Sequence, residues 1–122
     1  MSNVLIVEAD AIVRNLMIRV LSRQGFTVYE AANTQEALEL CKTFANEQLD
    51  LLIADHETTG SIVTEQILDA CANTKVLHIS GWPYELAQEK QALVRGSSFL
   101  QKPFTASELL TTVQTLLHPR MQ

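Results

Sequence analysis

The amino-acid sequence predicts a single α/β domain, spanning 1–122, with a parallel β-sheet covered by helices on both faces. Five short apolar runs alternate with five longer segments of helical periodicity. The runs are apolar at consecutive positions, which is typical of strands buried on both faces. Alternating strands and helices are typical of a parallel sheet, and a chain of 122 residues can bury a core of its own.

The predicted strands and the first two predicted helices follow from apolar spacing. The strands are the apolar runs at 4–7, 27–29, 51–54, 76–79 and 99–100. The first helical segment repeats apolar residues three and four positions apart from Ile12 to Leu21, and Gly25 suits the left-handed backbone that often ends a helix. The second opens with Asn-Thr-Gln-Glu at 33–36, which is close to a capping box, and its apolar positions run to Phe44.

Three further helices are predicted in the second half of the chain. The third carries apolar residues from Ile62 to Cys71, and the fourth follows Pro83 and ends at Gly96. The fifth opens with Thr-Ala-Ser-Glu at 105–108, which is a clear capping box, and continues with a strong apolar stripe.

Composition excludes several classes of protein. Apolar residues make up 47% of the chain and the net charge is −5, so we expect a folded domain that binds neither nucleic acid nor anionic membrane. The apolar runs are far shorter than the roughly 20 residues that cross a bilayer, and the first of them ends at Glu8, unlike a signal peptide. Cys41 and Cys71 lack metal-ligand spacing and are expected to be buried free thiols of a cytoplasmic protein.

Polar residues directly follow four of the five predicted strands. Because the carboxyl ends of parallel strands share one edge, where α/β proteins bind ligands, we expect carboxylates, a hydroxyl and an ammonium to meet there. Asp10 has a second interpretation, as the N-cap of the first helix. The residues at this edge are Glu8, Asp10, Asp55, His56, Glu57, Ser80 and Lys102.

Several carboxylates in one cleft need a compensating cation. Two carboxylates about 5 Å apart repel by roughly 3 kcal/mol at an effective dielectric constant of about 20. Either Lys102 or a hard divalent ion such as Mg²⁺ compensates this charge. An aspartate beside such cations can attack a phosphoryl group and form an aspartyl phosphate. The sequence has no glycine-rich phosphate loop or dinucleotide fingerprint, so nucleotide binding is unsupported.

At 4–8, 50–55, 78–81 and 99–104 the sequence resembles the receiver domain of bacterial two-component response regulators, and the resemblance covers nearly the whole chain. The run Phe-Leu-Gln-Lys-Pro-Phe at 99–104 is the most specific. With Ser-Gly-Trp-Pro-Tyr at 80–84, it is most similar to receivers attached to hybrid sensor histidine kinases. The resemblance implies a flavodoxin-like, doubly wound sheet of five parallel strands in the order 2-1-3-4-5, with five helices.

The resemblance also implies a role for several residues. Asp55 is the implied phosphoacceptor, and Ser80 is the hydroxyl residue that contacts the phosphoryl group. Lys102 is expected to pair with the carboxylates and then with the phosphoryl oxygens. Phe99 stands at the position of the family's aromatic switch residue, and the Lys102–Pro103 bond is expected to be cis.

The implied cofactor is Mg²⁺, and here the sequence departs from the family. The implied ligands are Glu8, Asp55 and the backbone carbonyl of Glu57, with Asp10 as a weak candidate. The family normally carries two adjacent acids after its first strand, and the second ligates the metal directly. Ala9 fills that second position, so we expect Mg²⁺ binding to be weakened.

Two functions are compatible with these residues. The first is a phosphorelay receiver that accepts a phosphoryl group at Asp55 from a sensor histidine kinase or phosphotransfer protein, and switches a protein-interaction face toward an output protein or domain. Such a domain is a switch and not an enzyme, with at most autocatalytic phosphorylation and dephosphorylation. The alternative is a pseudo-receiver that binds proteins independently of phosphorylation, because Ala9 replaces a metal-ligating acid.

Three further positions carry expectations about burial. His56 is expected to face solvent from a loop, whereas His78 alternates within a buried strand and is expected to be a core residue. The segment 82–84 contains two aromatic residues, which suit either packing or a partner surface.

Overall fold

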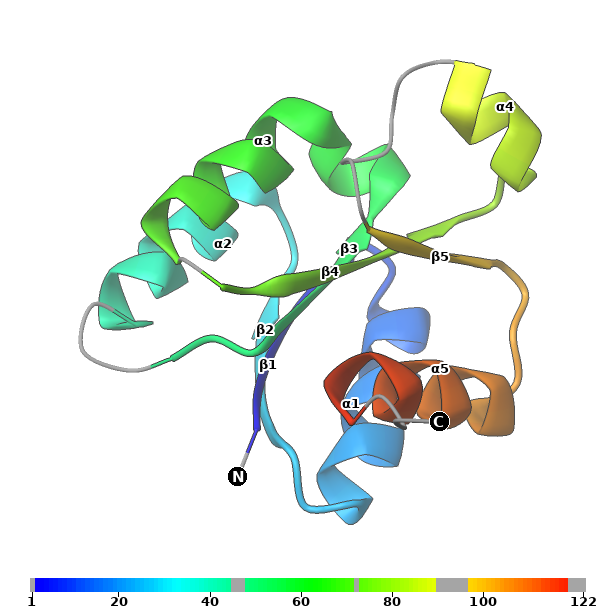
Figure 1. The fold of residues 1–122 in the computed structure, drawn as a ribbon, viewed down its shortest axis with the longest axis horizontal. Coiled ribbons are helices and arrows are strands. Elements are labelled where there is room, and N and C mark those ends of the chain that lie inside the picture. Colours follow the sequence, from blue (N-terminus) through cyan, green and yellow to red (C-terminus); the bar gives the residue numbers. More distant parts are fainter. Residues whose placement is uncertain (1, 45–47, 72, 90–96, 119–122) are drawn as a thin grey trace.

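The computed structural model describes residues 2–44, 48–71, 73–89 and 97–118, with the backbone alone at 58–63 and 88–89. Within these residues, five parallel strands form one sheet in the order β2-β1-β3-β4-β5 (Figure 1), the order that the resemblance implies. Val4 of β1 pairs with Val28 of β2 on one side and with Leu51 of β3 on the other. The strands are β1 (Asn3–Val7), β2 (Thr27–Ala31), β3 (Leu51–Asp55), β4 (Lys75–Ser80) and β5 (Ser98–Gln101).

Helices cover both faces of the sheet, as the alternating pattern predicts (Figure 1). On one face, α1 (Ala11–Arg23) packs against α5 (Ala106–Leu117), and on the other α2 (Thr34–Cys41) packs against α3 (His56–Ala70). The short helix α4 (Tyr84–Glu89) lies beyond the carboxyl end of β4. The structure therefore has the doubly wound, flavodoxin-like architecture.

The core is two hydrophobic clusters separated by the sheet. Val4 and Ile6 of β1 join the cluster under α1 and α5, together with Leu109. Leu5 and Val7 belong to the cluster under α2 and α3. All five side chains are fully buried, and each contributes roughly 1.5–3 kcal/mol of hydrophobic stabilisation. This two-sided burial explains why β1 is apolar at consecutive positions.

The helix ends follow the predicted capping residues. The Thr105 hydroxyl accepts the Glu108 N–H at 3.0 Å, and the Glu108 carboxylate accepts the Thr105 N–H at 2.9 Å, so the predicted capping box is confirmed. Asn33 caps α2 by accepting the Glu36 N–H at 2.9 Å. Gly25 has a φ of 91°, the left-handed conformation that favours glycine.

The structure differs from the sequence-based boundaries around two helices. The third helix begins at His56, directly after β3, and not near Ile62. Its first turns carry polar residues and lie past the end of the sheet, so the apolar pattern does not reveal them. The second helix ends at Cys41, and Phe44 lies in a separate 3₁₀ turn, Lys42–Phe44. The predicted continuation of the fourth helix, at 90–96, lies outside the described residues.

Both cysteines are buried free thiols, as predicted. Cys41 ends α2, Cys71 follows α3, and both belong to the same hydrophobic cluster. Burial, reinforced by the neighbouring Cys71, raises the pKa of the Cys41 thiol to about 12. At neutral pH this thiol is therefore protonated and a poor nucleophile.

Candidate functional site

The candidate site lies at the edge of the sheet where the parallel strands end. Asp55 ends β3 and Ser80 ends β4, whereas Glu8 follows β1 and Lys102 follows β5. The Lys102 N–H donates to the Ser80 carbonyl at 2.7 Å, which ties the end of β5 to the end of β4. The topology thus brings together four polar residues that lie far apart in the sequence.

A buried ion-pair triad forms the centre of the site. Lys102 Nζ lies 2.6 Å from Glu8 Oε1 and 3.0 Å from Asp55 Oδ1. Glu8 is only 1% exposed and Asp55 only 3% exposed, so the ammonium group compensates two carboxylates that water hardly reaches. Burial by itself would lower the pKa of Lys102, but hydrogen bonds and charge from Glu8 and Asp55 outweigh this effect and raise the pKa above 10.5.

The side chain of Glu57 binds the end of β4 at the site. Glu57 Oε1 accepts the Ser80 hydroxyl at 3.2 Å and the Gly81 N–H at 3.0 Å. The Ser80 hydroxyl oxygen in turn accepts the Trp82 N–H at 2.9 Å. Partial burial would raise the pKa of Glu57, but hydrogen bonds with the Gly81 N–H, with Asp55, with its own backbone N–H and with Ser80, in decreasing order, hold the pKa below its ordinary value of 4.5. Glu57 is therefore a carboxylate at neutral pH, and it holds the β4–α4 loop by two hydrogen bonds.

This role of the Glu57 side chain was not predicted from the sequence, where only the backbone carbonyl of Glu57 was expected to matter. The available signal was an acidic residue two positions after Asp55, opposite a Ser-Gly pair that offers a hydroxyl and an N–H. The direction of the side chain depends on the junction at Asp55, which has φ −71° and ψ 120° and leads straight into α3.

Arg14 is a second residue that the sequence analysis missed. Its Nη1 donates to the Glu8 carbonyl at 2.8 Å and to the Ala9 carbonyl at 3.4 Å. Its Nε forms an ion pair with Glu30 Oε1 at 3.1 Å. Arg14 thus fixes the backbone that carries Glu8 into the site. Its signal in the sequence was weak, because an arginine near the start of a helix is common on solvated surfaces.

The chain matches the response regulator receiver domain over residues 4–114. This protein belongs to the response regulator receiver domain family. Among curated relatives, it is 30% identical over 119 residues to the sensor kinase CckA of Brucella abortus, a match covering 95% of this chain and 12% of that protein. It is 31% identical to the uncharacterized transcriptional regulatory protein YrkP of Bacillus subtilis, covering 87% of this chain and 45% of that protein. The chain therefore spans less than half of these relatives.

Solved structures give the same result. The receiver domain of the hybrid histidine kinase CckA is similar with a TM-score of 0.79 and 30% identity, over 96% of this chain and all of that one. The chemotaxis response regulator CheY4 of Vibrio cholerae is similar with a TM-score of 0.80 and 26% identity, over 96% and 99% of the two chains. The predicted resemblance to receivers, including those of hybrid kinases, is confirmed.

Membership places this receiver in two-component signalling, consistent with a phosphorelay. Receivers are signalling switches and generally not enzymes. They interact with histidine kinases or phosphotransfer proteins and with output domains. Within the described residues, no helix combines the length and apolarity needed to cross a membrane.

Receivers typically bind Mg²⁺ at their acidic pocket. Glu8 uses Oε1 for Lys102 and Oε2 to accept the Asp10 N–H at 3.1 Å. Asp10 caps α1, where its Oδ1 accepts the Ile12 N–H at 2.8 Å, and Ala9 contributes no oxygen from its side chain. No three His, Cys, Asp or Glu residues gather as metal ligands in the described ranges. Among the implied ligands, Glu8 and Asp10 thus already use carboxylate oxygens for contacts within the chain, and Ala9 supplies no side-chain oxygen.

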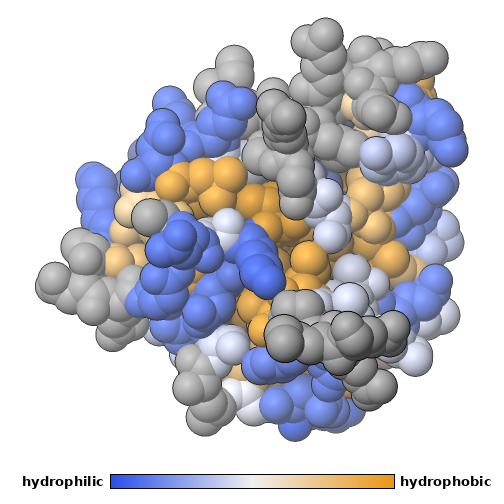
Figure 2. Space-filling view, in the orientation of Figure 1, coloured by the Kyte–Doolittle hydropathy of each residue, from blue (hydrophilic) through white to orange (hydrophobic). Residues whose placement is uncertain are grey.

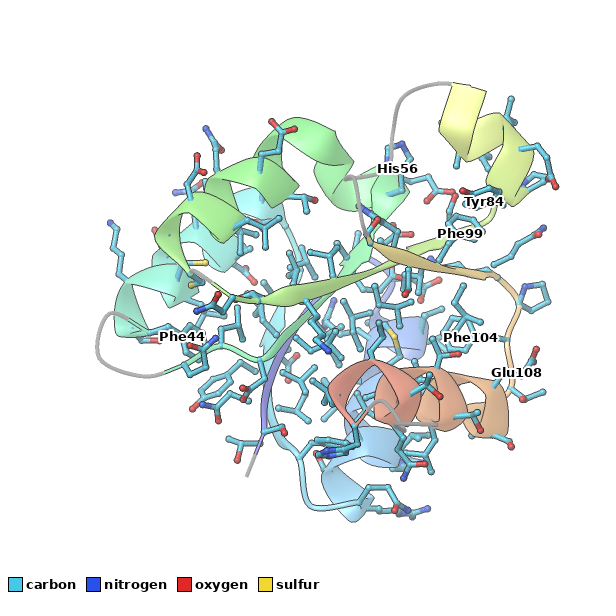
Figure 3. All side chains as sticks on the ribbon, in the orientation of Figure 1. Phe44, His56, Tyr84, Phe99, Phe104 and Glu108 are labelled. Carbon is cyan, nitrogen blue, oxygen red and sulfur yellow. The ribbon has the colours of Figure 1, made fainter. Side chains whose placement is uncertain are left out.

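Aromatic residues flank the site on the side of α4 (Figure 3). The rings of Tyr84 and Phe99 meet edge to face with centroids 5.5 Å apart, so Phe99 packs against an exposed tyrosine. The expectation that His56 faces solvent from a loop is wrong. His56 is the first residue of α3, is half-buried, and packs against Trp82 with centroids 5.2 Å apart, because α3 starts directly at the end of β3.

His78 is a fully buried residue of β4, as predicted. Burial, with a smaller contribution from His56, lowers the pKa of His78 to about 4. At neutral pH the imidazole ring is therefore uncharged. It belongs to the packed sheet, in register with Phe99 of β5, and not to the polar edge.

Proposed function

We propose that this receiver accepts a phosphoryl group on Asp55 from the phosphohistidine of a sensor histidine kinase or phosphotransfer protein. The single observation that carries the proposal is the 3.0 Å contact between Asp55 Oδ1 and Lys102 Nζ, in a site that also contains the Ser80 hydroxyl. An aspartate side chain, an ammonium group and a hydroxyl at one sheet edge are the groups that transfer to aspartate requires.

The chemistry of this transfer uses residues of the triad. A carboxylate oxygen of Asp55 attacks phosphorus while the phosphorus–nitrogen bond of the donor phosphohistidine breaks, and the electron pair of that bond stays on the imidazole ring. Lys102, already 3.0 Å from Asp55, stabilises the negative charge of the transferring group. Glu8 holds Lys102 at 2.6 Å and so positions its ammonium group.

Mg²⁺ binding is proposed to be weak in this receiver. When bound, the ion would add positive charge near the transferring group. The support is the donor set, in which Ala9 offers no carboxylate and Asp10 caps a helix. Transfer therefore depends more strongly on Lys102 than it would in a receiver that has both acids.

The phosphodonor is proposed to dock beside α1. Ile12 is 82% exposed and Leu16 is 41% exposed, which is unusual for large apolar side chains. A neighbouring groove of about 400 Å³ shares Lys102 with the triad, so a partner seated there lies next to Asp55. Ile12→Glu should weaken transfer from a cognate kinase and leave labelling by a small phosphodonor unchanged. The groove is lined by Val13, Leu16, Lys102, Pro103 and Phe104.

The switching face is proposed to lie over α4, β5 and α5. Tyr84 and Leu86 are exposed, and apolar surface gathers near α4 and β5 in the space-filling view (Figure 2). Tyr84 rests on Phe99 of β5, and Ser80 begins the loop that leads to α4. A phosphoryl group on Asp55 that attracts Ser80 would therefore change the position of the loop into α4. The contact between Tyr84 and Phe99 would then pass this change to the switching face.

The test is labelling by a small phosphodonor. Incubation with acetyl phosphate and millimolar Mg²⁺ should add the mass of one phosphoryl group, and Asp55→Asn should abolish the addition. An unlabelled wild-type protein would favour the second candidate, a pseudo-receiver that binds partners independently of phosphorylation, for which Ala9 is the supporting observation. In that case Asp55→Asn leaves partner binding intact.

A further inference from the structure

One oxygen atom of Glu57 takes both hydrogen-bond donors that the end of β4 offers to the site. Ser80 Oγ is 3.2 Å and Gly81 N is 3.0 Å from Glu57 Oε1. The Ser80 hydroxyl and the Gly81 amide each have a single hydrogen, so neither can serve a second strong acceptor at full strength. The arrangement is a small anion site that is already filled by a carboxylate of the same chain.

The carboxylates of Glu57 and Asp55 are close neighbours. They are two residues apart at the junction of β3 and α3, and a side-chain hydrogen bond with Asp55 contributes to the lowered pKa of Glu57. A phosphoryl group on Asp55 would carry a charge of about −1.5 to −2 at pH 7 and three acceptor oxygens. Lys102 can satisfy one of these oxygens, whereas the Ser80 and Gly81 donors already bind Glu57.

We propose that the Glu57 carboxylate is a built-in competitor of the phosphoryl group, occupying the Ser80 and Gly81 donors until phosphorylation displaces it. This inference rests on the proposed function, because competition requires a phosphoryl group on Asp55. Two consequences follow from the contacts. Phosphorylation is slowed, because the incoming group meets a second anion and occupied donors. The β4–α4 loop is also held in the unphosphorylated protein, because Glu57 provides the acceptor that the phosphoryl group would provide.

Glu57 differs from an ordinary helix-capping acid in where its hydrogen bonds go. A carboxylate in the first turn of a helix usually accepts backbone N–H groups of that turn. Glu57 Oε1 also reaches Ser80 and Gly81, more than twenty residues away in the sequence. Trp82 extends the connection, since its N–H donates to Ser80 Oγ at 2.9 Å. The loop that leads into α4 is thus linked to the charge of a single side chain.

The experiment compares three variants by amide NMR and by phosphorylation with acetyl phosphate and Mg²⁺. Glu57→Ala removes the carboxylate, and Glu57→Asp keeps the charge but shortens its reach by one methylene group. Glu85→Ala is the matched control, because it removes one exposed acid from the first turn of α4. Circular dichroism verifies that each variant is folded.

Glu57→Ala and Glu57→Asp are expected to shift the Gly81 and Trp82 amide resonances before any phosphodonor is added. Glu57→Ala is also expected to phosphorylate about tenfold faster than the wild type, since two charge-assisted hydrogen bonds no longer oppose the reaction. Glu85→Ala should leave the Gly81 resonance in place and the rate within about twofold. A general structural disturbance would slow phosphorylation and so does not explain acceleration. Glu57→Asp, which keeps the charge but shortens its reach, separates loss of the contacts from loss of the charge.

The possible failures are distinguishable. Unchanged Gly81 and Trp82 resonances in Glu57→Ala, or a rate no faster than that of the wild type, would overturn the inference. If no variant is phosphorylated, including Glu57→Ala, then the proposed function and the competition both fail. The Gly81 resonance would still show whether Glu57 holds the loop.

Discussion

Removal of the Lys102 ammonium group should destabilise the protein substantially. Lys102→Met replaces it with an apolar side chain of similar length and leaves Glu8 and Asp55 without their shared cation. Because both carboxylates contact one nitrogen, their oxygens lie within about 6 Å of each other and repel by roughly 3 kcal/mol at an effective dielectric constant of about 20. Glu8 and Asp55 stay buried when the lysine is removed, so their burial cost and their mutual repulsion remain without the compensating attraction.

Lys102→Met is therefore expected to lower the free energy of unfolding by about 3 kcal/mol at pH 7, the lower end of the range for breaking a buried ion pair. Adding Glu8→Gln should recover about half of that loss or more, because the repulsion disappears with the charge. The pairing raises the pKa of Lys102, so its contribution is complete below pH 10.5 and is lost only as the pH rises through the higher folded-state value.

Urea denaturation followed by far-UV circular dichroism and Trp82 fluorescence measures these changes. Lys75→Met is the control, since this lysine is exposed and donates to the Leu116 carbonyl of α5, and its replacement should change stability by less than about 0.5 kcal/mol. An unchanged free energy in Lys102→Met, or no recovery on adding Glu8→Gln, would refute the account of the triad.

Three further predictions follow from the site and the core. Ala9→Asp restores a carboxylate beside Glu8 and should increase Mg²⁺ affinity at least about tenfold by Trp82 fluorescence titration, whereas Ala9→Asn should give a much smaller gain. His78 has its pKa lowered from 6.5 to about 4, so the unfolded chain binds a proton that the folded chain does not, and stability should fall by about 3 kcal/mol between pH 6.5 and pH 4. In a plot of the urea midpoint against pH, His78→Leu should remove most of this fall, whereas His118→Gln, at an exposed site, should leave the fall unchanged. An equal slope in both variants would contradict the attribution of the fall to His78. The pKa of the Cys41 thiol is raised to about 12, so at pH 8 this thiol should react with Ellman's reagent at least about tenfold more slowly in the folded than in the urea-unfolded protein. Fast reaction in the folded protein would show that the thiol is accessible.

The fold was predictable because its signals are local and redundant. The run at 4–7 is apolar on both faces of its strand, and the capping box at Thr105 and Glu108 marks a helix start that packing does not override. Strand order came only from the family resemblance, since periodicity does not specify which strands pair. The start of α3 was missed because its first turns, beginning at His56, extend past the sheet and carry no apolar stripe.

The sequence allowed us to predict which residues meet at the site, but not which hydrogen bonds they form. Asp55, Ser80 and Lys102 converge because parallel strands end at one edge, a property of the topology alone. The contacts of Glu57 and Arg14 depend on backbone angles at the β3–α3 and β1–α1 junctions and on partners far away in the sequence. No periodicity or motif encodes those directions, so only the three-dimensional arrangement reveals a carboxylate seated on Ser80 and Gly81.

The most direct test of the central claim is the location of the phosphoryl group. After phosphorylation by a cognate kinase or by acetyl phosphate, borohydride reduction of the acyl phosphate followed by peptide mass spectrometry identifies the modified residue. The account predicts a single reduced position, at Asp55. Modification at the adjacent His56 or at Glu57, or no modification under conditions that label a control receiver, would contradict it.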